Sequence, residues 1–227
     1  PDAAPKGPAT AAAPADWTLG EKSVLWIRAD FSDSPGMPAT DSEIQTSMSR
    51  VNDFYLDVSN NRSSFRTVVL PEALRLSRTL AAYNTSPTAD AAIRTEAVAL
   101  ARAYDAANGN TGAYNPDRYD RWIVITRRLS VLGVAGRGLV GAAGVFLNGT
   151  TADVVVAHEL GHNHGLHHAD GWRPSGASPA GPGEHWPYGD VFDIMGSALL
   201  LSGGHFSSEA KDILLYLPVA DTPAVTA

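Results

Sequence analysis

The chain contains no cysteine, and this absence excludes several kinds of chemistry. Without a thiol there can be no disulfide framework, no thiolate zinc site and no cysteine nucleophile. A cysteine supplied by this chain also cannot block a metal centre as a latency plug. The absence leaves the redox compartment undetermined.

Positive charge and long apolar runs are also scarce. Against 24 acidic residues stand 17 Lys and Arg, so the formal net charge is 17 − 24 = −7, and there is no basic run. This balance argues against nucleic-acid binding. The stretch that comes closest to a membrane span, residues 129–147, contains Arg137 and five glycines, which is not typical of a spanning helix. We therefore expect neither a nucleic acid nor a membrane as partner.

The two ends of the chain differ in composition from its middle. Residues 1–16 are rich in Ala and Pro and have no periodic apolar face, so we expect a linker there and a similar tail at residues 218–227. Either end could lead into further domains. The chain begins with Pro1 rather than Met, and we expect that a targeting segment has been removed or that the chain has been trimmed. Residues 17–217 are long enough for one domain with a substantial core.

The most informative segment is residues 158–168, which read HELGHNHGLHH and contain H-E-x-x-H-x-x-G-x-x-H. Residues four apart lie on one face of a helix, so His158 and His162 can point at one metal ion. Glu159 need not bind that ion, because it can act as a general base beside it.

A third ligand requires the helix to end. Gly165 tolerates a positive φ and is suited to stop the helix, so that the chain turns back and brings His168 to the metal. On a straight helix His168 would lie roughly 9 Å along the axis from His162. His167 and Asp170 are the alternatives, but the G-x-x-H spacing favours His168. Three protein donors and an open fourth position are typical of catalytic zinc, while a closed structural zinc site or a polar helix without metal is the alternative.

Hydrophobic periodicity predicts strands and helices in mixed order. We expect strands at residues 22–31, 64–70, 74–80, 121–126 and 134–148. We expect helices at residues 41–58, 90–107 and 207–216, and a further helix that carries the histidines. The strands on either side of Pro71 should be two separate strands joined there. The motif Thr150-x-x-Asp153 resembles a capping box and should start the histidine helix.

This order indicates an α/β (α+β) chain. A mixed, twisted sheet and the histidine helix should form an upper lobe, about residues 17–165, and residues 166–217 a smaller irregular lower lobe. The metal site would lie in the cleft between them.

The extended motif resembles that of the metzincin zinc endopeptidases. In that clan a methionine turn lies beneath the metal, and here Asp193-Ile194-Met195-Gly196 follows at a suitable distance. HELGHNHGLHHAD, then Tyr188-Gly189-Asp190, and Gly204-His205-Phe206 before the last helix make the chain most similar to the gametolysin family. The likeness covers residues 147–216, about a third of the chain.

The resemblance implies a metzincin-like zincin fold with one Zn²⁺ per chain. The zinc would be held by His158, His162 and His168, with Met195 in the turn below. Zinc-bound water would be the nucleophile and Glu159 its general base. The chain would then be a secreted metalloendopeptidase that hydrolyses extracellular proteins or glycoproteins; a structural Ca²⁺ is left open.

Two other functions remain open at this point. One is a metzincin-like module that binds protein or glycan with little turnover, and the other is a metal-dependent hydrolase of a non-peptide bond. The intact Glu159 favours an enzyme, because a binding module has no need of a base.

The sequence departs from the family at two positions. Some metzincins place a zinc-binding tyrosine two residues after the turn methionine, where this chain has Ser197. The family also tends to have an apolar residue where His164 stands, and we expect His164 to be a solvated helix residue.

The glycine-rich segment is a candidate for substrate binding. A substrate backbone could pair with an edge strand near residues 141–145, where small side chains leave room for it. The candidate residues are Gly141, Ala142, Ala143 and Gly144. The alternative is that these glycines form a tight loop.

Several polar and aromatic residues near the motif have two interpretations. Tyr188 could approach the oxyanion of a substrate, or it could wall the cleft together with Trp172 and Trp186. Asp190 and Asp193 could orient the ligand imidazoles or cap local turns.

Overall fold

The computed structural model describes residues 14–217. The linker expected at residues 1–13 and the tail at 218–227 lie outside the described residues. Within the described part, the linker prediction is wrong at residues 15–16, which belong to a short helix α1 (Ala15–Thr18). Trp17 holds this helix down, because its indole N–H donates to the carbonyl of Asn163 at 2.7 Å and the guanidinium of Arg121 lies 3.8 Å over its ring.

A five-stranded sheet forms the centre of the molecule, in the order β2-β1-β3-β5-β4. The strands are β1 (Gly20–Asp30), β2 (Ser63–Arg75), β3 (Arg121–Thr126), β4 (Gly136–Gly138) and β5 (Gly144–Asn148). Every neighbouring pair is parallel except β4 with β5. The inner strands carry apolar residues on both faces, as parallel strands covered on two sides do. The mixed α/β sheet is therefore confirmed.

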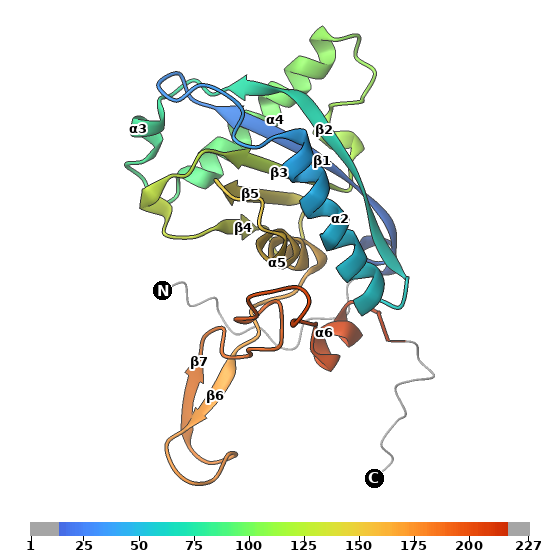
Figure 1. Ribbon diagram of the computed structural model, residues 1–227, viewed down its shortest axis with the longest axis vertical. Coiled ribbons are helices and arrows are strands. Elements are labelled where there is room, and N and C mark those ends of the chain that lie inside the picture. The colour runs from blue at the N-terminus through green and yellow to red at the C-terminus, as the bar shows by residue number, and fades with distance from the viewer. Residues whose placement is uncertain (1–13, 218–227) are drawn as a thin grey trace.

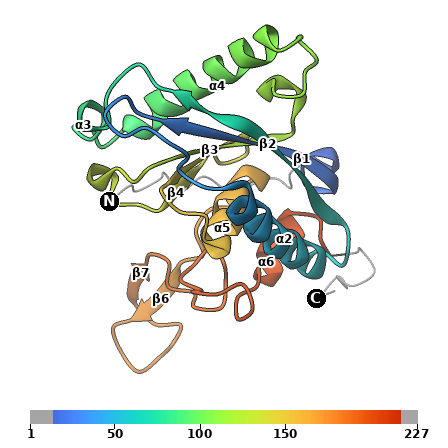
Figure 2. The ribbon, with the colours of Figure 1, turned by 45° about the horizontal axis from the view of Figure 1, so that its top comes forward.

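Helices cover both faces of the sheet (Figures 1 and 2). Helices α2 (Asp41–Val58) and α5 (Asp153–His164) pack on one face, and α4 (Ala89–Ala107) packs on the other. Short helical turns connect these elements: α3 (Leu80–Tyr83), η1 (Pro116–Arg118) and η2 (Ser130–Leu132). No helix in residues 14–217 is long and apolar enough to cross a membrane.

The residues after α5 have little regular structure. They contain a two-stranded hairpin of β6 (Gly171–Pro174) and β7 (Gly183–Trp186) and one short helix, α6 (Ser208–Ile213). In Figure 1 they lie below α5, away from the sheet. Helix α6 is shorter than the expected 207–216, because Leu215 adopts a left-handed backbone conformation with φ 61°.

The predicted break in the second strand is wrong, since β2 runs without interruption through Pro71. Proline lacks an N–H and is tolerated on an edge strand, and β2 is the outermost strand on its side of the sheet. The pairing of β1 with β2 shifts register between Trp26 and Arg28 instead of ending there. Residues 76–79, expected to extend a separate strand, lead into α3.

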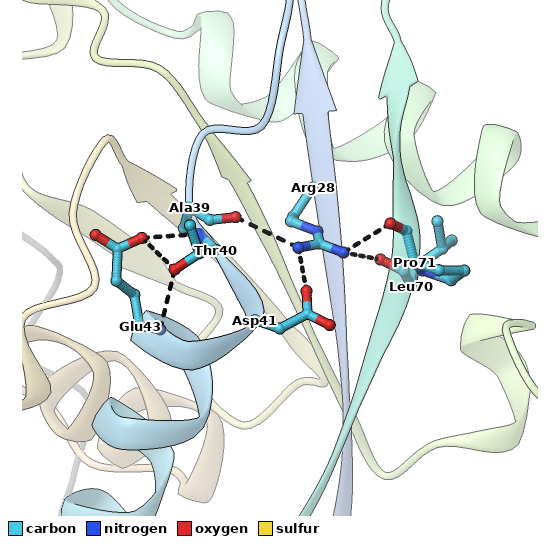
Figure 3. A network of polar contacts seen from close by, with 7 residues as sticks. All are labelled: Arg28, Ala39, Thr40, Asp41, Glu43, Leu70 and Pro71. Atoms are coloured by element: carbon cyan, nitrogen blue, oxygen red, sulfur yellow. Dashed lines mark hydrogen bonds and ion pairs between the residues drawn. The ribbon is translucent and has the colours of Figure 1, made fainter.

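Arg28 connects this irregularity to the start of α2 (Figure 3). Its guanidinium donates to the carbonyls of Leu70 at 2.8 Å and Pro71 at 2.9 Å on β2. On the other side it donates to the carbonyl of Ala39 at 3.4 Å and pairs with the carboxylate of Asp41. One buried side chain therefore joins two carbonyls of β2 to the residues at the start of α2.

Replacing Arg28 with Leu should destabilise the protein by several kcal/mol, because each buried carbonyl left without a donor costs about 1–3 kcal/mol. Urea unfolding measures the change. Arg102→Leu is the matched control, since Arg102 pairs with Asp117 at 2.7 Å on the exposed surface and should change stability little. Equal stability losses in the two variants would contradict this role of Arg28.

Candidate metal centre

Helix α5 ends where the sequence predicts. Gly165 adopts a left-handed conformation with φ 109°, and the N–H of Leu166 returns to the carbonyl of Gly161 at 3.0 Å. The predicted start is wrong in detail, because the N-cap is Ala152 and has no side-chain cap. Thr150 instead accepts a hydrogen bond from the N–H of Ala152 at 3.1 Å, within the turn that precedes the helix.

The three predicted histidine ligands come together. Ring nitrogens of His158, His162 and His168 all lie within 4.8 Å of one another. The Nε2 atoms of His162 and His168 are 3.1 Å apart. Two nitrogens bound tetrahedrally to one ion at about 2.0–2.1 Å would lie roughly 3.3 Å apart. The spacing is therefore suited to one shared metal ion. His167 and Asp170, the alternatives, are not part of this group.

Backbone carbonyls orient the two ligands that α5 carries. Nδ1 of His158 lies 2.8 Å from the carbonyl oxygen of Ile194, and Nδ1 of His162 lies 2.8 Å from that of Leu166. A carbonyl only accepts, so Nδ1 carries the proton and Nε2 keeps its lone pair for a metal.

Complete or partial loss of hydration keeps the three imidazoles neutral. It lowers the pKa of His158, and it lowers the pKa of His162 to about 3 and that of His168 to about 4, with the neighbouring histidines adding to the effect at the latter two. Metal binding needs neutral imidazole, so at neutral pH no proton has to be displaced from these ligands.

Glu159 follows His158 in α5 and lines the same cleft. Its side chain is buried, and its carboxylate accepts a hydrogen bond from the N–H of Gly138 on β4. Burial raises the pKa of Glu159 to about 7, although the Gly138 hydrogen bond and the positive charges of Arg94 and Arg137 act in the opposite direction. A carboxyl group with such a pKa can both take and return a proton near neutral pH.

The glycines of β4 allow α5 to pack against the sheet. A Cβ atom at Gly136 would lie 2.7 Å from the Glu159 carboxylate. One at Gly138 would clash with the backbone oxygen of Glu159 and lie 2.9 Å from Cβ of His162. At these two positions glycine is therefore required by helix–strand contact, which a sequence scan cannot distinguish from room for a substrate.

The expectation that a substrate strand pairs along residues 141–145 is wrong. Gly141, Ala142 and Ala143 form the turn between β4 and β5, and Gly141 donates its N–H to the carbonyl of His162 at 2.9 Å. Gly144 begins β5, which is already paired with β3 on one side and β4 on the other. The outermost strand on this side of the sheet is β4.

Replacing Gly138 with Ala should destabilise the fold by about 1–3 kcal/mol, since an extra carbon in a packed contact forces the backbone apart. It should also displace Glu159 from its N–H donor and reduce any activity of the site. Gly176→Ala is the control, because a Cβ there meets nothing. Thermal unfolding of the two variants compares them; a stable Gly138→Ala protein would contradict the close-packing explanation.

Met195 packs against the underside of α5. It is buried, and a Cβ at Gly161 would clash with its sulfur. The neighbouring carbonyl, that of Ile194, is the acceptor for His158. The segment thus supports the ligands by packing and by one hydrogen bond.

Asp190 and Asp193 cap turns in this segment. The Asp193 carboxylate accepts from the N–H of Met195 at 2.8 Å and of Ser207 at 2.7 Å. Asp190 accepts from the N–H of Phe192 at 2.8 Å and of Asp193 at 3.2 Å. The turn-capping alternative is therefore confirmed for both carboxylates.

The expectation that His164 is solvated is wrong. It is fully buried, its ring packs against Tyr55 at 5.4 Å and Phe65 at 5.7 Å, and its Nδ1 lies 2.8 Å from the carbonyl of Leu160. Burial lowers the pKa of His164 to about 3. Helix α5 contacts both the sheet and the neighbouring helix α2, so more than one of its faces is buried.

Sequence reasoning also missed Asn163, the residue before it. Its amide group donates to the carbonyls of Leu139 and Gly144, both at 3.0 Å. These two hydrogen bonds connect α5 to both ends of the β4–β5 turn. The signal was present, since an amide within a helix that must pack on a sheet has to find acceptors.

A cleft of about 380 Å³ opens beside Glu159 and His158. Tyr188 forms part of its wall. Most of the wall consists of apolar side chains, namely those of Val134, Ala135, Val154, Val155, Ile194, Ala198 and Leu199. Trp172 and Trp186, expected in this wall, are instead half-exposed on the β6–β7 hairpin. The cleft can therefore hold an apolar group next to the carboxyl group and the imidazoles.

The site thus combines three neutral imidazoles, a buried carboxyl group and an apolar cleft. Such a set can bind one divalent ion and move a proton beside it. Comparison of the chain with models of known protein families and with curated proteins finds no match in either.

Proposed function

We propose that this chain is a zinc-dependent endopeptidase of the metzincin type, most similar to gametolysin, which is secreted and hydrolyses peptide bonds of extracellular proteins. The observation that carries the proposal is the convergence of three imidazoles together with a buried carboxyl group, that of Glu159, in the same cleft as His158. Structural zinc sites are usually closed by four protein ligands and need no such carboxyl group.

The residues present fit a zinc ion. His158, His162 and His168 would hold it through their ring nitrogens, and the 3.1 Å between two of these nitrogens is suited to a shared ion. Bound zinc would supply Lewis acidity, which lowers the pKa of water and polarises a carbonyl group.

Glu159 would act as general base and then as general acid during hydrolysis. Its carboxylate takes a proton from the attacking water and later delivers it to the amine that leaves. Burial raises the pKa of this group, which aids the delivery, and the nearby positive charge of a metal would favour the ionised form that accepts the proton. The N–H of Gly138 keeps the carboxylate in place.

A substrate backbone would lie along the outer edge of β4, the outermost strand beside the site. Extended peptides bind in this way when a sheet edge offers unpaired N–H and C=O groups. An apolar side chain of the substrate would enter the cleft next to Glu159. We therefore expect cleavage beside apolar residues.

Metal analysis and a cleavage assay test this function together. The purified chain should contain one zinc per molecule and degrade an unfolded protein such as casein. Removal of zinc by a chelator should abolish cleavage, and zinc should restore it. A chain that binds zinc but cleaves nothing in a broad peptide library would favour a binding module instead; a chain that binds no zinc would contradict the proposal.

A further inference from the structure

The third histidine is held differently from the other two. His158 and His162 each have a backbone carbonyl at Nδ1. His168 lies on the irregular segment beyond Gly165 and is exposed. Within residues 14–217, the one hydrogen-bond contact of its ring is that between its Nε2 and Nε2 of His162. Nε2 is the atom that faces the metal position. The other ring nitrogen, Nδ1, therefore has no hydrogen bond within these residues that would fix the orientation of the imidazole.

The ring of Tyr188 packs against the His168 imidazole. Its centroid lies 3.9 Å from the centroid of the His168 ring, with 36° between the planes. It also lies 6.1 Å from the His158 ring, nearly parallel at 23°. One aromatic ring therefore extends over two of the three ligands and is in direct contact with the one that lacks a carbonyl partner.

The backbone holds Tyr188 in an uncommon conformation. Its φ is +56°, in the left-handed region that residues with a Cβ rarely adopt. The carboxylate of Asp170 accepts a hydrogen bond from the N–H of Tyr188 at 3.0 Å. The two segments also touch through their glycines, since a Cβ at Gly189 would lie 2.6 Å from the backbone nitrogen of Gly171. The segment of His168 thus supplies the contacts that place Tyr188 over His168.

We infer that Tyr188 is the positioning residue of the third metal ligand and that Asp170 holds Tyr188 in that position. The ring limits the rotation of the His168 imidazole by packing, in the way that a hydrogen-bond partner at Nδ1 does for the other two. Partners of this kind raise metal affinity because the ligand is already oriented before the ion binds. The inference rests on the proposed metal centre.

The zinc dissociation constant of the full chain, measured by competition with a chromogenic chelator, tests this role without any activity assay. Tyr188→Ala should bind zinc about 10-fold or more weakly, the range that loss of a supporting partner usually costs. Tyr188→Phe keeps the ring and should bind zinc like the unmodified chain. Trp186→Ala is the matched control, because Trp186 is a similarly exposed aromatic residue two positions away that packs on Arg173 instead.

Two further variants separate the ring from the backbone and from folding. Tyr188→Gly favours the left-handed backbone but lacks the ring, so it should lose zinc affinity like Tyr188→Ala even though its backbone is relaxed. Asp170→Asn should weaken zinc binding less than Tyr188→Ala. Thermal unfolding of the zinc-free variants checks that each is folded.

The outcomes distinguish this inference from the proposed function. If the unmodified chain binds zinc and Tyr188→Ala binds it equally well, the positioning role is refuted and the metal centre stands. If Tyr188→Phe loses affinity as Tyr188→Ala does, the phenol rather than the ring acts, which also overturns the inference. Failure of the unmodified chain to bind zinc would refute the metal centre itself.

Discussion

Glu159→Gln is expected to lower the rate of peptide hydrolysis by about 10²–10⁴-fold, the usual contribution of a general base, while zinc content remains one per chain. The glutamine side chain has the same shape and its carbonyl oxygen can still accept from the N–H of Gly138. The fold and the metal site should therefore survive, and only the ability to take a proton is removed. Zinc analysis and the initial rate of casein cleavage measure the two effects.

Glu209→Gln is the control for this substitution. Glu209 is an exposed carboxylate in the first turn of α6, outside the cleft, and its replacement should leave both zinc content and rate unchanged. Equal turnover by Glu159→Gln and the unmodified chain would refute the role of Glu159 as base. Loss of zinc from Glu159→Gln would instead show that this carboxylate supports the metal.

His168→Ala should weaken zinc binding by more than about 100-fold, because loss of a mere supporting partner already costs about 10–100-fold. His167→Ala should leave the affinity unchanged, since His167 lies outside the group of converging nitrogens. The two histidines are adjacent and both exposed, so each variant serves as the control for the other. Zinc affinity from chelator competition decides between them, and the reverse ranking would overturn this choice of third ligand.

Local signals predicted several elements to the residue. The helix expected at residues 41–58 from apolar residues at helical spacing is α2. The structure adds a capping box of Thr40 and Glu43 at its start. The compact apolar strand expected at residues 121–126 is β3. In both cases the information lies within the segment itself.

The metal ligands were predictable for the same reason. The spacing of four between His158 and His162 follows from helix geometry, and Gly165 ends the helix through its own backbone freedom. His168 needed one more step, namely that the chain turns back after the glycine. The structure confirms that these three histidines lie close enough for one ion, and zinc itself remains a proposal.

The errors share a different cause. Pro71 does not break its strand because β2 lies at the edge of the sheet. Gly141 lies in a turn and Gly144 on an inner strand because β4 takes the outer position. His164 is buried because α2 and β2 pack beside it. Each depends on which element becomes a neighbour of which, and residues far apart in the chain decide that.

The sequence by itself therefore determined which three histidines converge, the helix that carries two of them and the residue at which that helix ends, since all of these depend on contacts between residues a few positions apart. Only the tertiary structure decided that Glu159 is buried against Gly138, that β4 is the outer strand, and that Tyr188 packs on His168. These features arise from sheet order and from the packing of distant segments, and no local pattern specifies them.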